Sequence, residues 1–182
     1  MKGEEKHLII SSPSEDFIKT LYSQLNNIHS FEINKKEFVI SDIKVFDIKL
    51  KNKFITASPI VLYKNSKTGE FFKFYKNLDN FDFFLNRLKD NAIKKYNSYY
   101  KTNFNLEGEI FDKLMPRVRN GRIDIYTKIS KKGRDFFIVG SSWKLLEKTK
   151  INKEEAKFYK FIMDCGLGEK NSLGFGFLNP LK

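Results

Sequence analysis

The feature that most constrains this chain is a glycine-rich stretch near its carboxyl end, residues 166–176. It holds four of the ten glycines in the sequence: Gly166, Gly168, Gly174 and Gly176. Because glycine has no Cβ atom, this density predicts a tight bend or a backbone that lies very close to another group. A polar centre separates the two glycine pairs: Glu169, Lys170, Asn171 and Ser172. Backbone amides, a lysine and two polar side chains together predict a site for anionic oxygens, most simply those of a nucleic-acid backbone.

The familiar nucleotide-binding loops do not match this stretch. A dinucleotide fingerprint would need a glycine where Asn171 lies, and a Walker loop would need Lys and Ser or Thr where Phe175 and Gly176 lie. Nucleotide hydrolysis is therefore disfavoured. Two plainer interpretations stay open: a flexible link between a helix and a last strand, and a fragment of the RNA-binding strand of an RRM domain.

The run Gly-Leu-Gly-Glu-Lys-Asn-Ser-Leu-Gly-Phe-Gly-Phe-Leu, residues 166–178, resembles the C-terminal glycine-rich loop of the CRISPR-associated endoribonucleases that process repeat RNA. These enzymes belong to the RAMP superfamily. Residues 57–61, Ala-Ser-Pro-Ile-Val, are similar to the strand that opens the second domain in that family. The resemblance implies tandem ferredoxin-like (RRM-like) domains, RNA as the partner, and no cofactor. It also implies cleavage without a metal, by attack of a ribose 2′-hydroxyl on the adjacent phosphorus.

The resemblance does not identify a catalytic residue in this chain. Family members that cut RNA place a histidine, with Tyr or Lys helpers, in the first half of the N-terminal domain, and no positions here correspond. The catalytic residues are therefore unknown, with His7 as the candidate base, since histidine titrates near neutral pH. His29 is a weaker candidate, and an ordinary surface position is the alternative for both. These two histidines and the single cysteine, Cys165, lack the usual zinc-ligand spacing, so no metal site is expected.

The charge of the chain also indicates RNA binding. Thirty-four Lys and Arg against 22 Asp and Glu give a net charge of +12, which attracts polyanions. A second RNA contact is predicted where Arg117, Arg119 and Arg122 surround an Asn-Gly turn, because arginine binds phosphate or stacks on bases. A solvated strand and turn is the alternative there. The basic residues of a helix near 80–100, Lys95 among them, are expected to be solvated or to contact RNA.

Membrane association is not expected. The sequence has no apolar run approaching the roughly 20 residues of a membrane span and no signal peptide. A single cysteine allows no disulfide within the chain, which suits a reducing compartment. We therefore expect a cytoplasmic protein.

Residues 1–50 predict a partial ferredoxin-like unit of strand, helix and strand. The expected strands are 7–11 and a long bulged strand within 37–50, and the helix is expected to begin at Ser12 with Pro13 in its first turn. This order matches the back half of a ferredoxin-like domain, with the front half missing from the sequence. An open half-sheet exposes an apolar face, which predicts cover by another CRISPR-associated protein, by a second copy of the chain or by the missing segment.

Residues 54–182 predict a complete ferredoxin-like domain. We expect a strand at 54–63 with a short return strand at 71–75, a helix at 80–100, a loop with a short helix at 104–115, strands at 117–128 and 135–147, a helix capped by Asn152 and Glu155, and a strand at 175–178. Apart from the return strand, this is the βαββαβ order, so the fold class is α+β.

The function that the sequence favours is that of an RNA-binding protein of CRISPR defence, similar to the endoribonuclease that cuts precursor CRISPR RNA within its repeats. Two alternatives stay open. One is a non-catalytic relative that only binds repeat RNA. The other is a RAMP structural subunit that coats guide RNA in an effector complex.

Overall fold

The structure is a computed structural model that describes residues 4–33, 35–74, 81–131 and 133–181. The chain divides into two compact units, residues 1–49 and residues 50–182. Each is described here by itself.

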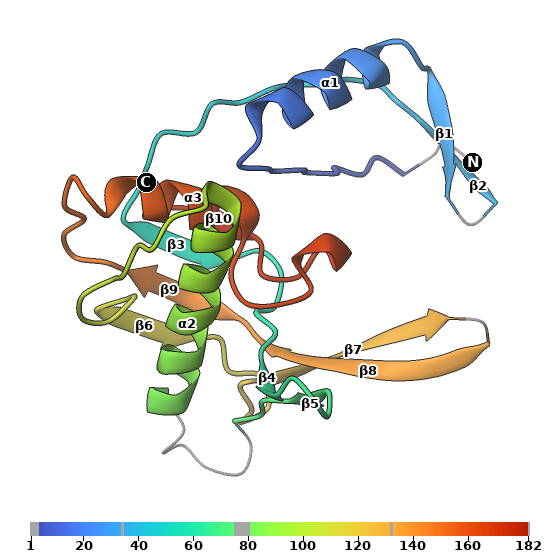
Figure 1. Ribbon diagram of the computed structural model, residues 1–182. Coiled ribbons are helices and arrows are strands. Elements are labelled where there is room, and N and C mark those ends of the chain that lie inside the picture. The colour runs from blue at the N-terminus through green and yellow to red at the C-terminus, as the bar shows by residue number, and fades with distance from the viewer. Residues whose placement is uncertain (1–3, 34, 75–80, 132, 182) are drawn as a thin grey trace. The chain divides into compact units, whose positions relative to one another are not determined.

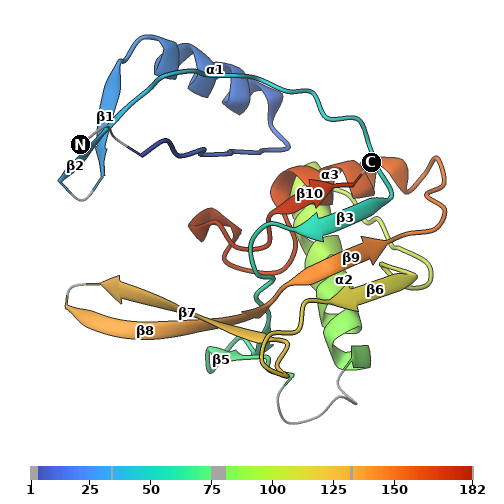
Figure 2. The same ribbon diagram turned by 180° about the vertical axis from the view of Figure 1, so that it is seen from behind.

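A four-stranded antiparallel sheet forms the centre of residues 50–182. Its strands are β3 (Lys53–Thr56), β6 (Lys113–Pro116), β9 (Trp143–Glu147) and β10 (Leu178–Pro180), in the spatial order β10-β3-β9-β6. Helices α2 (Phe81–Tyr100) and α3 (Ala156–Cys165) cover one face of this sheet (Figures 1 and 2). Along the chain these elements run β3-α2-β6-β9-α3-β10, which is the βαββαβ order. The predicted α+β class is therefore confirmed.

The core lies between this sheet and the two helices. Helix α2 buries Phe84, Leu88, Ala92 and Tyr96, one residue per turn, so one stripe of the helix faces the sheet. The ring of Phe84 stacks on the fully buried indole of Trp143 at a centroid distance of 5.0 Å. Helix α3 begins after a reciprocal cap in which Glu155 N–H donates to Asn152 Oδ1 (2.8 Å) and Asn152 N–H donates to Glu155 Oε2 (3.3 Å). This confirms the predicted cap.

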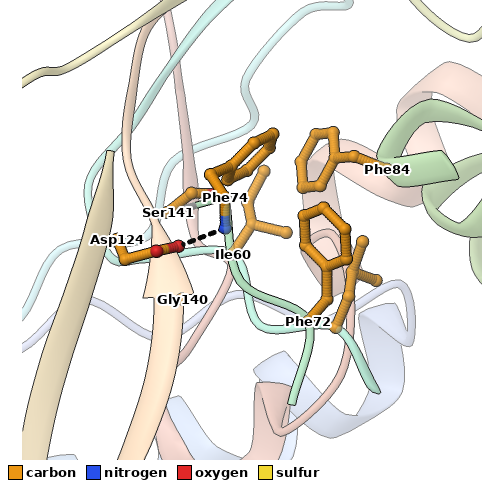
Figure 3. A pocket seen from close by; sticks show the side chains of 8 residues that line it. Ile60, Phe72, Phe74, Phe84, Asp124, Gly140 and Ser141 are labelled. Atoms are coloured by element: carbon orange, nitrogen blue, oxygen red, sulfur yellow. Dashed lines mark hydrogen bonds between the residues drawn. The ribbon is translucent and has the colours of Figure 1, made fainter. Parts of the chain in front are cut away.

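Two hairpins are added to the central sheet. Strands β7 (Asp124–Lys131) and β8 (Arg134–Ser141) form a ribbon that extends away from it (Figure 1), and β4 (Tyr63–Asn65) pairs with β5 (Glu70–Phe71). At the base of the ribbon, the buried Asp124 carboxylate accepts the N–H of Phe74 at 2.9 Å (Figure 3). Aromatic and aliphatic side chains fill the space around this bond, so the region is packed core and not a ligand site.

Several predicted strands in this unit have different bounds. The strand expected at 54–63 ends at Thr56, before Pro59, which has no N–H for a ladder. The strand expected at 117–128 begins only at Asp124, and the one expected at 135–147 is two strands, β8 and β9, interrupted at Ser142. No helix forms within 104–115, the last expected strand lies at 178–180, and positions 75 and 80 of the expected strand and helix are outside the described residues.

Residues 1–49 contain helix α1 (Glu15–Asn26) and a hairpin of β1 (Ser30–Ile33) and β2 (Lys36–Val39). The helix was predicted correctly, but its N-cap is Ser14, whose Oγ accepts the Phe17 N–H at 3.2 Å, and not Ser12. The strand expected at 7–11 is wrong, and only the first residues of the one expected at 37–50 are paired. A strand needs a neighbour for its hydrogen bonds, and the described residues provide none for these runs. The ferredoxin-like nature of this unit stays a prediction.

Candidate nucleic-acid interface

The glycine loop, residues 166–176, starts where helix α3 ends. Gly166 caps the helix with φ of 80° and donates its N–H to the Ile162 carbonyl at 3.0 Å. The loop then closes on itself, because Leu167 N–H donates to the Gly176 carbonyl at 2.9 Å. It is also joined to the strand-like residues before β4: Glu169 N–H donates to the Val61 carbonyl (2.8 Å), and Gly176 N–H to the Pro59 carbonyl (2.8 Å). This bonding does not match a flexible link.

Three of the four glycines are required by packing inside the protein. Gly166, Gly168 and Gly176 are buried and have positive φ, which side chains rarely adopt. A Cβ atom at Gly168 would collide with the Val61 carbonyl oxygen, and one at Gly176 with the Leu167 carbonyl oxygen. Gly174 is different, since it is exposed and a Cβ there would have nothing within 4 Å. Only Gly174 therefore presents its bare backbone to a ligand.

The side chains of Lys95 and Asn171 hold the loop in shape. Lys95, from helix α2, donates from Nζ to the Gly166 carbonyl (2.7 Å), the Gly168 carbonyl (3.0 Å) and Asn171 Oδ1 (2.9 Å). Asn171 in turn donates from Nδ2 to the carbonyls of Leu167 (3.0 Å) and Phe175 (2.9 Å). Burial lowers the pKa of Lys95 below its ordinary value. Both side chains thus use their hydrogen-bond donors on the loop itself, and a contact of Asn171 with RNA stays a prediction.

An ion pair fixes the other side of the loop. Arg87 of helix α2 donates from Nη2 to Glu169 Oε1 at 2.9 Å, and both side chains are largely buried. The second carboxylate oxygen of Glu169 and the Nε of Arg87 both bond to the backbone of Tyr63 in β4. Glu169 Oε2 accepts the Tyr63 N–H (2.6 Å), and Arg87 Nε donates to the Tyr63 carbonyl (3.2 Å). Lys95 and Arg87 were not predicted as residues of this site. Their position on a basic helix gave no signal that they face the loop.

The apex of the loop carries the groups that are available to a ligand. A short 3₁₀ turn, Asn171–Leu173, places Ser172 and Gly174 in solvent. The N–H groups of Asn171 and Ser172 donate no hydrogen bond to any residue that the structure describes. Lys170 has a left-handed backbone, with φ of 63°, and its Nζ lies 5.5 Å from the centre of the Tyr63 ring. A cation, a hydroxyl and free amides at one exposed turn can bind an anionic oxygen.

The predicted arginine cluster is only partly a surface feature. Arg119 and Arg122 are exposed and exchange backbone hydrogen bonds of 2.9 Å across the Asn120–Gly121 turn, where both residues have positive φ. Arg117 is half-buried, donates its N–H to the Ser142 carbonyl at 2.7 Å, and has a buried Nε without a partner among the described residues. Within the described chain, no hydrogen bond or ion pair joins this turn to the glycine loop. The structure thus brings Arg119 and Arg122 together and sets Arg117 apart.

The titratable residues considered for chemistry lie elsewhere. His7 and His29 are exposed in the unit of residues 1–49, so their part in catalysis stays a prediction. Cys165 precedes the loop, and burial raises the pKa of its thiol to about 11, which disfavours a reactive thiolate at neutral pH. Among the residues described, no three or more His, Cys, Asp and Glu are grouped as metal ligands would be. None of the described helices could cross a membrane.

The net positive charge of the chain comes from the unit that contains the loop. Residues 1–49 carry seven Lys and eight Asp or Glu, a net charge of −1. The whole chain has a net charge of +12, so residues 50–182 carry +13. Any attraction of a polyanion is therefore exerted by the unit of residues 50–182.

Comparison with known proteins identifies the family. Residues 42–180 match the family model described as "CRISPR associated protein Cas6, C-terminal". The chain belongs to the Cas6 family of CRISPR-associated proteins. The matched residues include helices α2 and α3, which cover the central sheet, and end just beyond the glycine loop.

Two Cas6 proteins of Methanocaldococcus jannaschii are similar over nearly the whole chain. One, named CRISPR-associated endoribonuclease Cas6 2, is 61% identical over 184 residues, which is all of this chain and 76% of that protein. The other, CRISPR-associated endoribonuclease Cas6 1, is 33% identical over 175 residues, 94% of this chain and 62% of that protein. A solved structure titled "CRISPR associated protein Cas6" has a TM-score of 0.61 and 25% identity, covering 94% of this chain and 66% of its own. These matches confirm the family resemblance that the glycine-rich stretch indicated.

Proposed function

We propose that this Cas6-family chain binds CRISPR repeat RNA and acts in the cutting of precursor CRISPR RNA within its repeats. The observation that carries the proposal is the apex of the glycine loop, which presents Lys170, Ser172 and the bare backbone of Gly174 on a unit of net charge +13. The 61% identity to a protein named as a CRISPR-associated endoribonuclease supports the same function. The expected cytoplasmic location stays a prediction.

The loop is built to be rigid before RNA arrives. Lys95, Asn171 and the Arg87–Glu169 pair bond its interior, so the free amides at the apex already have fixed positions. A preformed site loses less conformational entropy when the ligand binds. Phosphate oxygens are the ligand class that these donors suit, with Lys170 as the positive charge. Arg119 and Arg122 are proposed as a second contact, where they can bind phosphate or stack on an unpaired base.

The proposed cleavage needs three groups around the scissile phosphate. A base takes the proton of the ribose 2′-hydroxyl, an acid protonates the leaving 5′-oxygen, and positive charge stabilises the phosphorane. The products are a 2′,3′-cyclic phosphate and a 5′-hydroxyl. His7 is the candidate base within this chain, because histidine is the commonest general base in proteins and His7 is exposed.

The test is incubation of the full chain with CRISPR repeat RNA in EDTA, followed by analysis of RNA ends and of mobility in a native gel. Cleavage to a cyclic phosphate that His7→Ala abolishes would support both the enzyme and its base. His29→Ala, an exposed histidine in the same unit, is the control. A gel shift without cleavage would restrict the chain to RNA binding. No shift at low salt would overturn the proposal.

A further inference from the structure

An aromatic pair lies beside the apex of the glycine loop. Tyr63 of β4 and Phe71 of β5 are cross-strand partners, and their rings stack with centroids 5.0 Å apart and an interplanar angle of 13°. Lys170 Nζ, at the apex, lies over the Tyr63 ring, 5.5 Å from its centre. Both aromatic residues are only half-buried. A cation, the free amides of the apex and an open aromatic surface are therefore adjacent within the unit of residues 50–182.

The ion pair that holds the loop also fixes the position of Tyr63. Glu169 Oε2 accepts the Tyr63 N–H at 2.6 Å, and Arg87 Nε donates to the Tyr63 carbonyl at 3.2 Å. Because an isolated hairpin is at best marginally stable, these bonds are needed to hold β4 beside the loop. The ring and the apex are thus parts of one bonded structure. A ligand that contacts both would meet them in fixed relative positions.

A small apolar cluster supports the partner ring. Phe71 packs against the buried side chains of Val61, Ile138 and Phe175. Ile138 belongs to β8 and Phe175 to the glycine loop, so Phe71 is held from both sides of the hairpin's attachment. A supported ring loses little conformational entropy when a ligand stacks against it.

A nucleotide suits this combination of groups better than an inorganic anion does. Single-stranded RNA is recognised through unpaired bases that stack on aromatic side chains. One ribose joins a phosphate to its base, so a base can reach the neighbouring ring while its phosphate binds the apex amides. The stem of Lys170 is long and flexible, so its ammonium can move from the ring to the phosphate and leave the ring to the base.

We propose that Tyr63, supported by Phe71, is a stacking subsite for one unpaired base of the RNA whose phosphate binds the apex of the glycine loop. The inference rests on the proposed function, since it assigns a base contact to the same site. The subsite accepts any of the four bases, because every base has a π face. It favours single-stranded nucleotides over those of a continuous duplex, whose bases are already stacked on one another.

The experiment measures binding of the full chain to CRISPR repeat RNA at several salt concentrations, for Tyr63→Leu and for Tyr63→Phe. Tyr63→Leu should lower affinity about tenfold and leave the slope of log affinity against log salt unchanged, because stacking neutralises no phosphate. Tyr63→Phe keeps the ring and should bind as the unaltered chain does. Equal affinities of the two variants would overturn the proposal, whether both bind fully or both are weakened. The fluorescence of Trp143, the single tryptophan, reports whether residues 50–182 remain folded.

Abasic RNA gives a second measurement, which does not depend on the folding of a variant. Replacing one unpaired nucleotide at a time by an abasic nucleotide removes one base and keeps every phosphate. At one position the unaltered chain should lose about tenfold in affinity, and Tyr63→Leu should lose little more there, because the contact is already absent. The absence of any such position would overturn the stacking subsite.

Failure of this inference is distinct from failure of the proposed function. If the unaltered chain does not bind repeat RNA at low salt, the proposed function is overturned, and the subsite with it. If the unaltered chain binds and Tyr63→Leu binds equally well, only the stacking subsite is overturned.

Discussion

Arg87 of helix α2 and Glu169 of the glycine loop form an ion pair with Nη2 and Oε1 2.9 Å apart. The pair joins the helix that covers the central sheet to the loop that is proposed to bind RNA. It also bonds the backbone of Tyr63 through the second oxygen of the carboxylate and through Nε of the guanidinium. The position of the loop is therefore set by the same core that folds the domain.

Removal of Arg87 should loosen the loop and lower the stability of the domain. Arg87→Met leaves a largely buried carboxylate with only the Tyr63 N–H as donor, which should reduce the free energy of unfolding by about 1–3 kcal/mol. Urea denaturation followed by Trp143 fluorescence measures this. Lys64→Met removes an exposed pair with Glu70 and should cost no more than about 0.5 kcal/mol. Equal effects of the two changes would contradict the structural role of the Arg87–Glu169 pair.

Lys95 should make the stability of the domain depend on pH in the alkaline range. Burial lowers its pKa in the folded state below the ordinary 10.5, so the unfolded chain binds more protons between those two values. The free energy of unfolding of the unaltered chain, relative to Lys95→Met, should therefore rise as pH increases through this window up to about 10.5. Urea denaturation at a series of pH values gives the difference. Lys94→Met, on the exposed side of the same helix, is the control, and a falling difference would contradict the buried position of Lys95.

The glycines of the loop should separate into two classes. Gly176→Ala adds a Cβ atom that collides with the Leu167 carbonyl at a residue with φ of 72°, so the loop must shift. We expect a loss of stability of roughly 2–4 kcal/mol from strain and broken packing. Gly174→Ala meets no atom and should cost only the roughly 1–2 kcal/mol of a left-handed alanine. Thermal denaturation ranks the two variants, and the reverse order would contradict the loop geometry.

The helices of the domain could be predicted from the sequence because their signals are local. Phe84, Leu88 and Ala92 recur once per turn, and Asn152 with Glu155 forms a cap within four residues. The break between β8 and β9 could not be predicted, since the apolar pattern continues through it while the two strands pair with different neighbours. The strands expected near residues 7–11 and 37–50 could not be judged from the local pattern, because a strand also needs a neighbouring strand for its backbone hydrogen bonds.

The glycine loop could be predicted as a site, but the roles of its residues could not. The sequence indicates that some group lies very close to the backbone of Gly168 and Gly176. Only the fold shows that the neighbouring atoms are carbonyl oxygens of the protein itself. Asn171 was predicted to contact RNA because it is polar. In the structure it bonds the backbone on both sides of the turn, as well as Lys95. The family resemblance identified the loop from its residue order, without this geometry.

Lys170 should contribute to RNA binding through its charge. If its ammonium neutralises one phosphate, Lys170→Ala should reduce the slope of log affinity against log salt by about one. Filter binding of repeat RNA at several salt concentrations measures the slope. Lys153→Ala removes an exposed lysine outside the loop and is the control. An unchanged slope for Lys170→Ala would exclude a phosphate contact at this residue.

The most direct test of the proposed RNA contact is the affinity of Gly174→Ala for CRISPR repeat RNA at low salt. Gly108→Ala is its matched control, because Gly108 is also exposed, has a positive φ of 66° and leaves a Cβ in open space. If the apex holds a phosphate against the bare backbone of Gly174, affinity should fall about tenfold, equivalent to about 1.4 kcal/mol, for Gly174→Ala alone. Equal affinity of both variants and the unaltered chain would contradict the account.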